Sequence, residues 1–140
     1  MNKKLFYTLI LLFACNFLVV ARDVYDCKAQ STGILIFLAD SIDFRSDLTR
    51  VYGRMSGRPH TSGRIDFMSA VSGGKEMMAT DIDGVDFKRY FQWEDDGIIP
   101  IEIDFPPMKP NGPITIKTNG PTGESIWKIS LGKLRKKRRK

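Results

Sequence analysis

Cysteine and histidine are scarce in this chain of 140 residues, which contains two cysteines and one histidine. The lone His60 cannot build a multi-histidine zinc site, and no Cys-x-x-Cys pair supplies the missing ligands. A nucleophilic dyad of Cys27 with His60 has no support from the residues around either side chain. We therefore expect no catalytic site and no cofactor, and we rank a small hydrolase last among the functions considered.

Long hydrophobic runs are also few, and the clearest one occupies residues 5–20, directly after Lys3 and Lys4. A positive start, an apolar stretch shorter than the ~20 residues that span a bilayer, and a small residue at the end are typical of a secretory signal peptide. We expect residues 1–21 to be this signal, cleaved after Ala21. The mature protein would then be secreted or periplasmic and have no transmembrane span. The alternatives are a lipid anchor on Cys15 and a leader that is retained as a membrane anchor.

Cleavage of the leader would also remove Cys15 and leave Cys27 without a partner in the same chain. A lone cysteine outside the cytoplasm is either a buried, inert thiol or one half of a disulfide between two chains. We favour the buried thiol, and a homodimer through Cys27 is the alternative.

Positive charge is concentrated at the C-terminus, in a chain whose formal net charge is +6. Outside the leader and this terminus, acidic residues outnumber basic ones. Because like charges repel, we expect residues 133–140 to form a flexible arm. Its partners would be anionic polymers or surfaces such as polysaccharides, lipid headgroups or extracellular nucleic acid. The basic residues of this segment are Lys133, Arg135, Lys136, Lys137, Arg138, Arg139 and Lys140.

Apolar and polar residues alternate with a period of two over much of the chain after Leu48, most clearly at residues 99–105, and this pattern predicts half-buried strands. Asp83-Gly84, Asp96-Gly97 and Asn119-Gly120 are turn signals that predict three successive hairpins. Residues 33–38 are predicted to be a fully buried strand, and residues 40–47 are the one place where we expect a helical turn. We expect residues 22–132 to form a single all-β domain, an antiparallel sandwich of about 7–8 strands with immunoglobulin-like dimensions. A small closed β-barrel is the alternative.

Two acidic groups are candidate sites. Asp81, Asp83 and Asp86 surround a glycine turn and are weak candidates for calcium, although their spacing differs from that of a helix-loop-helix calcium loop. Glu102 and Asp104 share a strand face as a paired carboxylate would, but a domain this small leaves little room for a sugar cleft. Solvated strand and turn carboxylates explain both groups more simply.

Together these features predict a secreted or periplasmic binding module without catalysis. It would contact a macromolecular partner, a protein or an anionic polymer, through loops or an edge strand. Arg58 and His60, in the loop at residues 57–63, are predicted partner contacts, as are the basic residues of the C-terminal segment. The alternative is a structural or assembly subunit of a surface or secretion structure, which would pair edge strands between chains.

Overall fold

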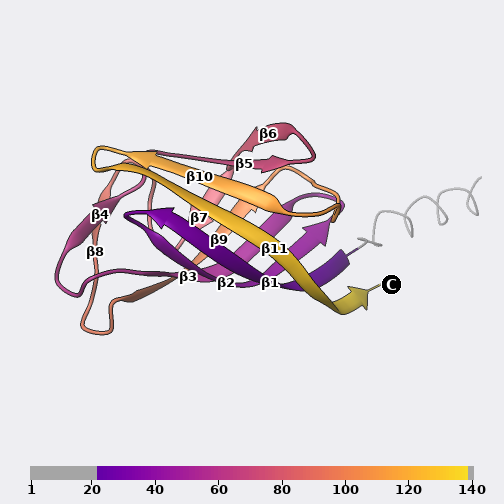
Figure 1. The fold of residues 1–140 in the computed structure, drawn as a ribbon, viewed down its shortest axis with the longest axis horizontal. Helices are drawn as coiled ribbons and strands as arrows, with labels where there is room; N and C mark the ends of the chain where they lie inside the picture. The colour runs from indigo at the N-terminus through magenta and orange to yellow at the C-terminus, as the bar shows by residue number, and fades with distance from the viewer. Residues whose placement is uncertain (1–21, 139–140) are drawn as a thin grey trace, which may run out of the picture.

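The computed structural model describes residues 22–138, so the predicted leader with Cys15, and also Arg139 and Lys140, lie outside the described residues. The described regular structure consists of eleven strands (Figure 1). They are β1 (Arg22–Gly33), β2 (Ile36–Arg45), β3 (Thr49–Ser56), β4 (Ser62–Arg64), β5 (Phe67–Ser72), β6 (Lys75–Met78), β7 (Asp81–Asp83), β8 (Tyr90–Gln92), β9 (Ile98–Phe105), β10 (Ile114–Gly120) and β11 (Gly123–Arg138).

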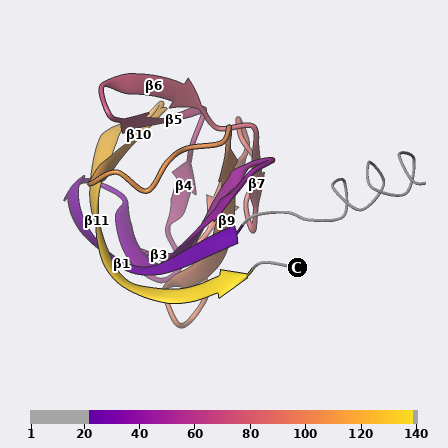
Figure 2. The same ribbon diagram turned by 90° about the vertical axis from the view of Figure 1, so that its right-hand side faces the viewer.

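Nine of these strands form one antiparallel sheet in the order β6-β5-β10-β11-β1-β2-β3-β9-β7, and β4 pairs with β8 in a small second sheet. The large sheet curls into a half-barrel, which Figure 2 shows end-on. The predicted all-β antiparallel class is confirmed. The arrangement is one curled sheet with a small companion, and it is not clearly the predicted immunoglobulin-like sandwich.

A single segment, residues 75–83, connects the two ends of the curled sheet. β6 pairs with β5, and just after it the Ala79 amide donates to the Met68 carbonyl across 2.9 Å. The next residue changes partner, because the Thr80 amide donates to the Asp104 carbonyl of β9 across 2.8 Å. β7 then continues along β9. The segment therefore passes from one edge strand of the sheet to the other. It brings these two edges together, as a closed barrel would, and is the observed feature most similar to the barrel alternative.

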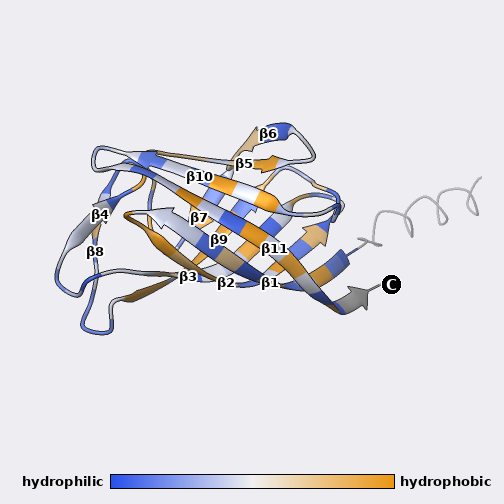
Figure 3. Ribbon diagram, viewed as in Figure 1, coloured by the Kyte–Doolittle hydropathy of each residue, from blue (hydrophilic) through white to orange (hydrophobic). Residues whose placement is uncertain are grey.

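The core fills the concave side of the sheet, and hydrophobic residues alternate with hydrophilic ones along its strands (Figure 3). Such alternation places every second side chain on the same face of a strand. At the centre, the indole of Trp127 stacks on Phe37 with 4.5 Å between ring centroids. The largest fully buried side chains are Trp127, Phe37, Phe105, Ile42, Met55, Ile65, Met68, Ile103, Ile114, Ile116, Ile129 and Val51.

Residues 33–38 do not form the fully buried strand that their apolar composition predicts. Leu35 and Phe37 are buried, but Ile34, Ile36 and Leu38 are 55%, 49% and 39% exposed. The segment contains the turn from β1 into β2, and the side chains of β2 alternate between the core and solvent. The prediction of complete burial is therefore wrong, because an uninterrupted apolar run does not reveal which of its residues face out.

The helical turn predicted at residues 40–47 is also absent from the described structure, because β2 continues to Arg45. Ile42 and Phe44 are two residues apart and both lie in the core, on one face of the extended strand that pairs with β1 and β3. A register shift between Ala39 and Ser41 sets which residues of this half of β2 face inward.

Of the three predicted hairpins, the one at Asn119-Gly120 is confirmed, since Gly120 pairs with Gly123 where β10 turns into β11. Gly84 and Gly97 do adopt the positive φ expected of turn glycines, 103° and 65°. Their turns do not join paired neighbours, however, because β8 pairs with β4. The ring of Phe91 in β8 packs closely over Gly63 of β4. A Cβ on Gly63 would lie 2.7 Å from the nearest atom of this ring, which is too close. A glycine in β4 thus admits the ring that holds this second sheet together.

Candidate functional site

The loop that carries Arg58 and His60 is tied to the loop after β8. The His60 amide donates to the Trp93 carbonyl across 2.9 Å, and His60 Nε2 lies 3.1 Å from Asp95 Oδ1. Both of these side chains are more than two-thirds exposed. Arg58 is exposed beside them. No described hydrogen bond or ion pair joins His60 to Cys27, so the structure offers solvent-facing polar contacts here and no assembled nucleophile.

The calcium candidates do not converge on one point. Asp81 and Asp83 are exposed on β7, where Asp81 Oδ1 accepts a hydrogen bond from the Ile82 amide across 2.9 Å. Asp86 lies 4.0 Å from Arg89. Among residues 22–138, no group of three or more His, Cys, Asp or Glu side chains has an arrangement that could hold a metal ion. The geometry therefore lends the calcium hypothesis no support.

Asp104 is committed to an ion pair and does not form a carboxylate pair with Glu102. Arg50 Nε and Nη2 donate to the two carboxylate oxygens of Asp104 across 2.7 and 3.0 Å. This hydrogen bonding raises the pKa of Arg50 above its ordinary value, chiefly through Asp104 and also through Tyr52. Glu102 instead lines a surface groove of about 420 Å³ together with Asp40 and other residues. The outer face of β9 thus offers one engaged and one available carboxylate.

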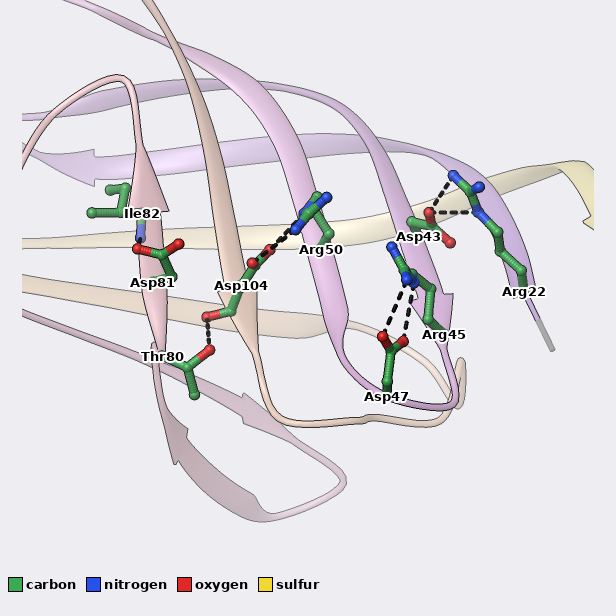
Figure 4. A network of polar contacts seen from close by, with 9 residues as sticks. All are labelled: Arg22, Asp43, Arg45, Asp47, Arg50, Thr80, Asp81, Ile82 and Asp104. Carbon is green, nitrogen blue, oxygen red and sulfur yellow. Dashed lines mark hydrogen bonds and ion pairs between the residues drawn. The ribbon is translucent and has the colours of Figure 1, made fainter. Parts of the chain in front are cut away.

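A second ion pair, between Arg22 and Asp43, lies on the same outer face, on the neighbouring strands β1 and β2 (Figure 4). Arg50 of β3 is opposite Asp43 of β2, and Asp43 Oδ2 accepts a hydrogen bond from Arg22 Nε across 2.8 Å. The Asp43 side chain is only 1% exposed, and its other oxygen has no hydrogen-bond partner within the described chain. Oppositely charged groups therefore alternate across β1, β2, β3 and β9, which stabilises their register.

Cys27 is buried in β1, as the sequence favours, with 6% of its surface exposed. Burial raises the pKa of its thiol from 9.0 to about 11, with smaller contributions from Asp40 and Asp26 and an opposing one from Arg135. A thiol in this state reacts slowly, because the thiolate is the nucleophile. The alternative of a homodimer through Cys27 stays a prediction. Because the thiol is buried, a second chain would reach it only if this part of the sheet opened.

We expect native protein at pH 8–9 to resist alkylation at Cys27, whereas protein unfolded in guanidinium chloride should react readily. Stability should also fall as the pH rises from about 9 to about 11, because over that range the unfolded thiol loses its proton and the folded one keeps it. Intact mass after iodoacetamide treatment measures the first effect. Equal labelling of native and unfolded protein would show that the thiol is accessible.

The basic C-terminal segment is ordered into the sheet up to Arg138, which differs from the flexible arm that its charge predicts. β11 continues through residues 133–138 along β1, where Leu134 pairs with Tyr25, and two register shifts accommodate the bend. Arg135 Nε donates to Asp26 Oδ1 across 2.6 Å, and Arg135 also lies 3.7 Å from Asp40. Strand pairing with β1 and these carboxylates offset the self-repulsion of the basic run up to Arg138.

Three lysines gather on the outer face of neighbouring strands in the sheet, and we call Lys28, Lys117 and Lys128 the basic face. They belong to β1, β10 and β11 respectively. Lys28 is opposite Ser130 and Lys117 is opposite Ile126, so each is a diagonal neighbour of Lys128, about 7–8 Å away. None of the three forms an ion pair with a residue that the structure describes. A depression of about 420 Å³ lies beside Lys28 and Lys128.

The opposite side of the half-barrel carries the other sign of charge. Asp81, Asp83 and Glu102 project from the outer faces of β7 and β9. Figure 2 shows β7 and β9 across the molecule from β10 and β11. The mildly acidic composition of the body therefore conceals two sides with opposite charge, and the positive side shares strand β11 with the basic C-terminal segment.

Sequence reasoning predicted the basic segment but missed the basic face. Each of its lysines occupies an ordinary polar position in an alternating strand. Only the pairing of β1, β10 and β11 brings them together, and that pairing joins distant parts of the chain. A search for polar positions carrying the same charge in several strands would have found the lysines without showing that they are neighbours.

No protein-family model, curated protein or solved structure matches this chain. In the part of the chain that the structure describes, no helix is long and apolar enough to cross a membrane.

Proposed function

We propose that the mature protein is a secreted or periplasmic, non-catalytic binding domain that attaches to an anionic polymer or surface through its basic face and the basic end of β11. The observation that carries the proposal is the set of three neighbouring lysines without ion-pair partners among the described residues, on the strands beside the C-terminal segment. Such a concentration of one charge attracts polyanions and raises their association rate. The acidic opposite side would orient the domain on its target.

Nucleophile and metal chemistry have no comparable support. The described cysteine is buried, the described histidine pairs with an exposed aspartate, and Asp104 is engaged by Arg50. The basic face presents amines that bind anions and carries no group positioned to transfer a proton or attack a substrate. Binding is therefore the activity that these side chains support.

Assembly with other chains is the second candidate, favoured by the exposed row of Ile34, Ile36 and Leu38. These side chains are 39–55% exposed; Ile34 lies in the turn before β2, and Ile36 and Leu38 follow on the outer side of β2. Exposed apolar side chains that are contiguous often mark contacts between proteins. A molar mass that rises with concentration in light scattering, and that Ile36→Ser reduces, would support assembly.

We expect Lys28→Glu and Lys128→Glu each to lower the salt concentration at which the protein elutes from a sulfated resin. Arg54→Glu, an equal change of charge at an exposed site on β3, is the matched control and should elute close to the wild type. Reversal in place is cleaner than deletion of residues 133–140, because deletion would also remove strand pairing with β1. Equal shifts for all three variants would mean that net charge alone governs retention, and the proposal would fail.

A further inference from the structure

Two exposed aromatic rings on the small sheet and the start of β5 each carry a cation. The guanidinium of Arg64 lies 5.1 Å from the centre of the Tyr90 ring, and Lys88 Nζ lies 5.1 Å from the centre of the Phe67 ring. Tyr90 is 63% exposed and Phe67 is 52% exposed. Exposing two large aromatic rings forgoes the free energy that their burial would contribute. Because each ring lies beside a cation, the pairs are suited to an anionic ligand.

The two pairs belong to one continuous surface. The Lys88 amide donates to the Ile65 carbonyl across 2.8 Å, which fixes Lys88 beside the strand that carries Arg64. Arg64 Nε donates to Asp66 Oδ1 across 2.6 Å. Asp66, Phe67 and Lys88 line a single depression of about 340 Å³.

This surface reaches the basic face through Phe67. Its ring lines a second depression, of about 220 Å³, whose wall includes Lys117 and also the carboxylates of Glu76 and Glu124. From Lys117 the next cations are Lys128 and then Lys28, across β10, β11 and β1. Aromatic rings and cations, with these carboxylates beside them, therefore form a track from β8 and β4 over β5 to β1.

We propose that this track binds a linear acidic polysaccharide, with Tyr90 and Phe67 contacting sugar rings while the lysines pair with carboxylate or sulfate groups. The inference rests on the proposed function and names the class of polyanion. In Figure 2, β5 and β1 lie at opposite ends of a curved wall, with β10 and β11 between them. A flat lipid surface can touch only part of such a wall, whereas a flexible chain can follow all of it.

The side chains along the track favour a polysaccharide over a single-stranded nucleic acid. Nucleic-acid bases stack flat on open aromatic faces. Here a cation lies over one face of each ring, at 5.1 Å in both cases, and so competes with a stacked base for that face. A sugar ring would meet the same competition for that face, but its hydroxyl groups can donate hydrogen bonds to the carboxylates of Glu76 and Glu124 beside Phe67, whereas a phosphodiester backbone has no donor for them.

The test measures the affinity of heparin oligosaccharides for the mature protein carrying Phe67→Ser or Tyr90→Ser. Each change should weaken binding about fivefold or more. Both side chains are largely exposed, so the fold should survive, which thermal unfolding would verify. Ile36→Ser, assayed at a concentration at which light scattering shows the monomer, is the control, since Ile36 is similarly exposed at 49% but lies on β2, away from the track.

The outcomes separate this inference from the proposed function. Loss of binding in Lys128→Glu with unchanged binding in both aromatic variants would overturn the track while leaving charge-based attachment intact. Unchanged binding in Lys128→Glu would refute the proposed function itself. Equal or tighter binding to a single-stranded oligonucleotide of matched charge, or to vesicles of anionic lipid, would overturn the assignment to polysaccharide.

Discussion

Replacing Trp127 with alanine should lower the free energy of unfolding by about 3–5 kcal/mol. Trp127 is wholly buried in β11 and stacks on Phe37 of β2. Its Nε1 also donates a hydrogen bond to the Leu35 carbonyl across 3.0 Å. The change would therefore remove a large apolar contact and leave a buried acceptor without its donor. These contacts hold the turn between β1 and β2 against β11, where Lys128 lies.

Urea unfolding followed by circular dichroism measures this loss. Tyr90→Ala is the control, because that ring is 63% exposed and its removal should change stability by no more than about 0.5 kcal/mol. A cost for Trp127→Ala as small as that of the control would show that the core is not organised around the stacked pair.

Replacing Arg22 with methionine should be the second costly change, lowering the free energy of unfolding by about 2–4 kcal/mol. Methionine keeps the aliphatic stem but removes the group that donates to Asp43 Oδ2 across 2.8 Å. Asp43 is 1% exposed, and Oδ2 is its one carboxylate oxygen with a hydrogen-bond partner among the described residues. The change would leave both oxygens without such a partner. The partial exposure of Arg22, 35%, keeps the expected cost below that of a wholly buried pair.

Adding Asp43→Asn to the Arg22→Met variant should restore much of the lost stability, because a neutral amide is less costly to bury than an unpaired carboxylate. Urea unfolding of the two single variants and the double variant gives the coupling energy. Additive losses in the double variant would show that the two side chains act independently, contrary to their observed contact.

The sequence was most informative where local pattern alone determines structure. Strand β9 follows from the alternation of Ile101, Ile103 and Phe105 with Glu102 and Asp104, and the β10–β11 hairpin follows from a turn sequence flanked by paired strands. In both cases the residues that determine the structure are neighbours in the chain.

The sequence was least informative where residues far apart in the chain determine the structure. The pairing of β8 with β4 depends on Gly63 leaving space for Phe91, and the two turns around β8 look like hairpin turns in isolation. Order in the C-terminal segment depends on β1, with Asp26 offsetting the charge of Arg135. Local charge density describes repulsion within the segment and carries no information on this partner strand.

The candidate site shows the same limit. The basic segment is visible as a run of letters, whereas Lys28, Lys117 and Lys128 become neighbours only through the sheet. Arg58 and His60 were predicted as contacts, and the structure places them in an exposed loop beside Asp95. No described contact connects that loop to the basic face, so it stays a separate prediction.

The most direct test of the central claim is the salt dependence of heparin affinity for the wild type, Lys128→Glu and Arg54→Glu. Binding through the basic face predicts that the affinity of the wild type falls steeply as the salt concentration rises. The reason is that the protein's lysines release condensed counterions from the polymer when they bind it. The logarithmic slope should decrease by about one for Lys128→Glu and stay unchanged for Arg54→Glu. An affinity independent of salt, or the same slope for Lys128→Glu as for the wild type, would contradict the account.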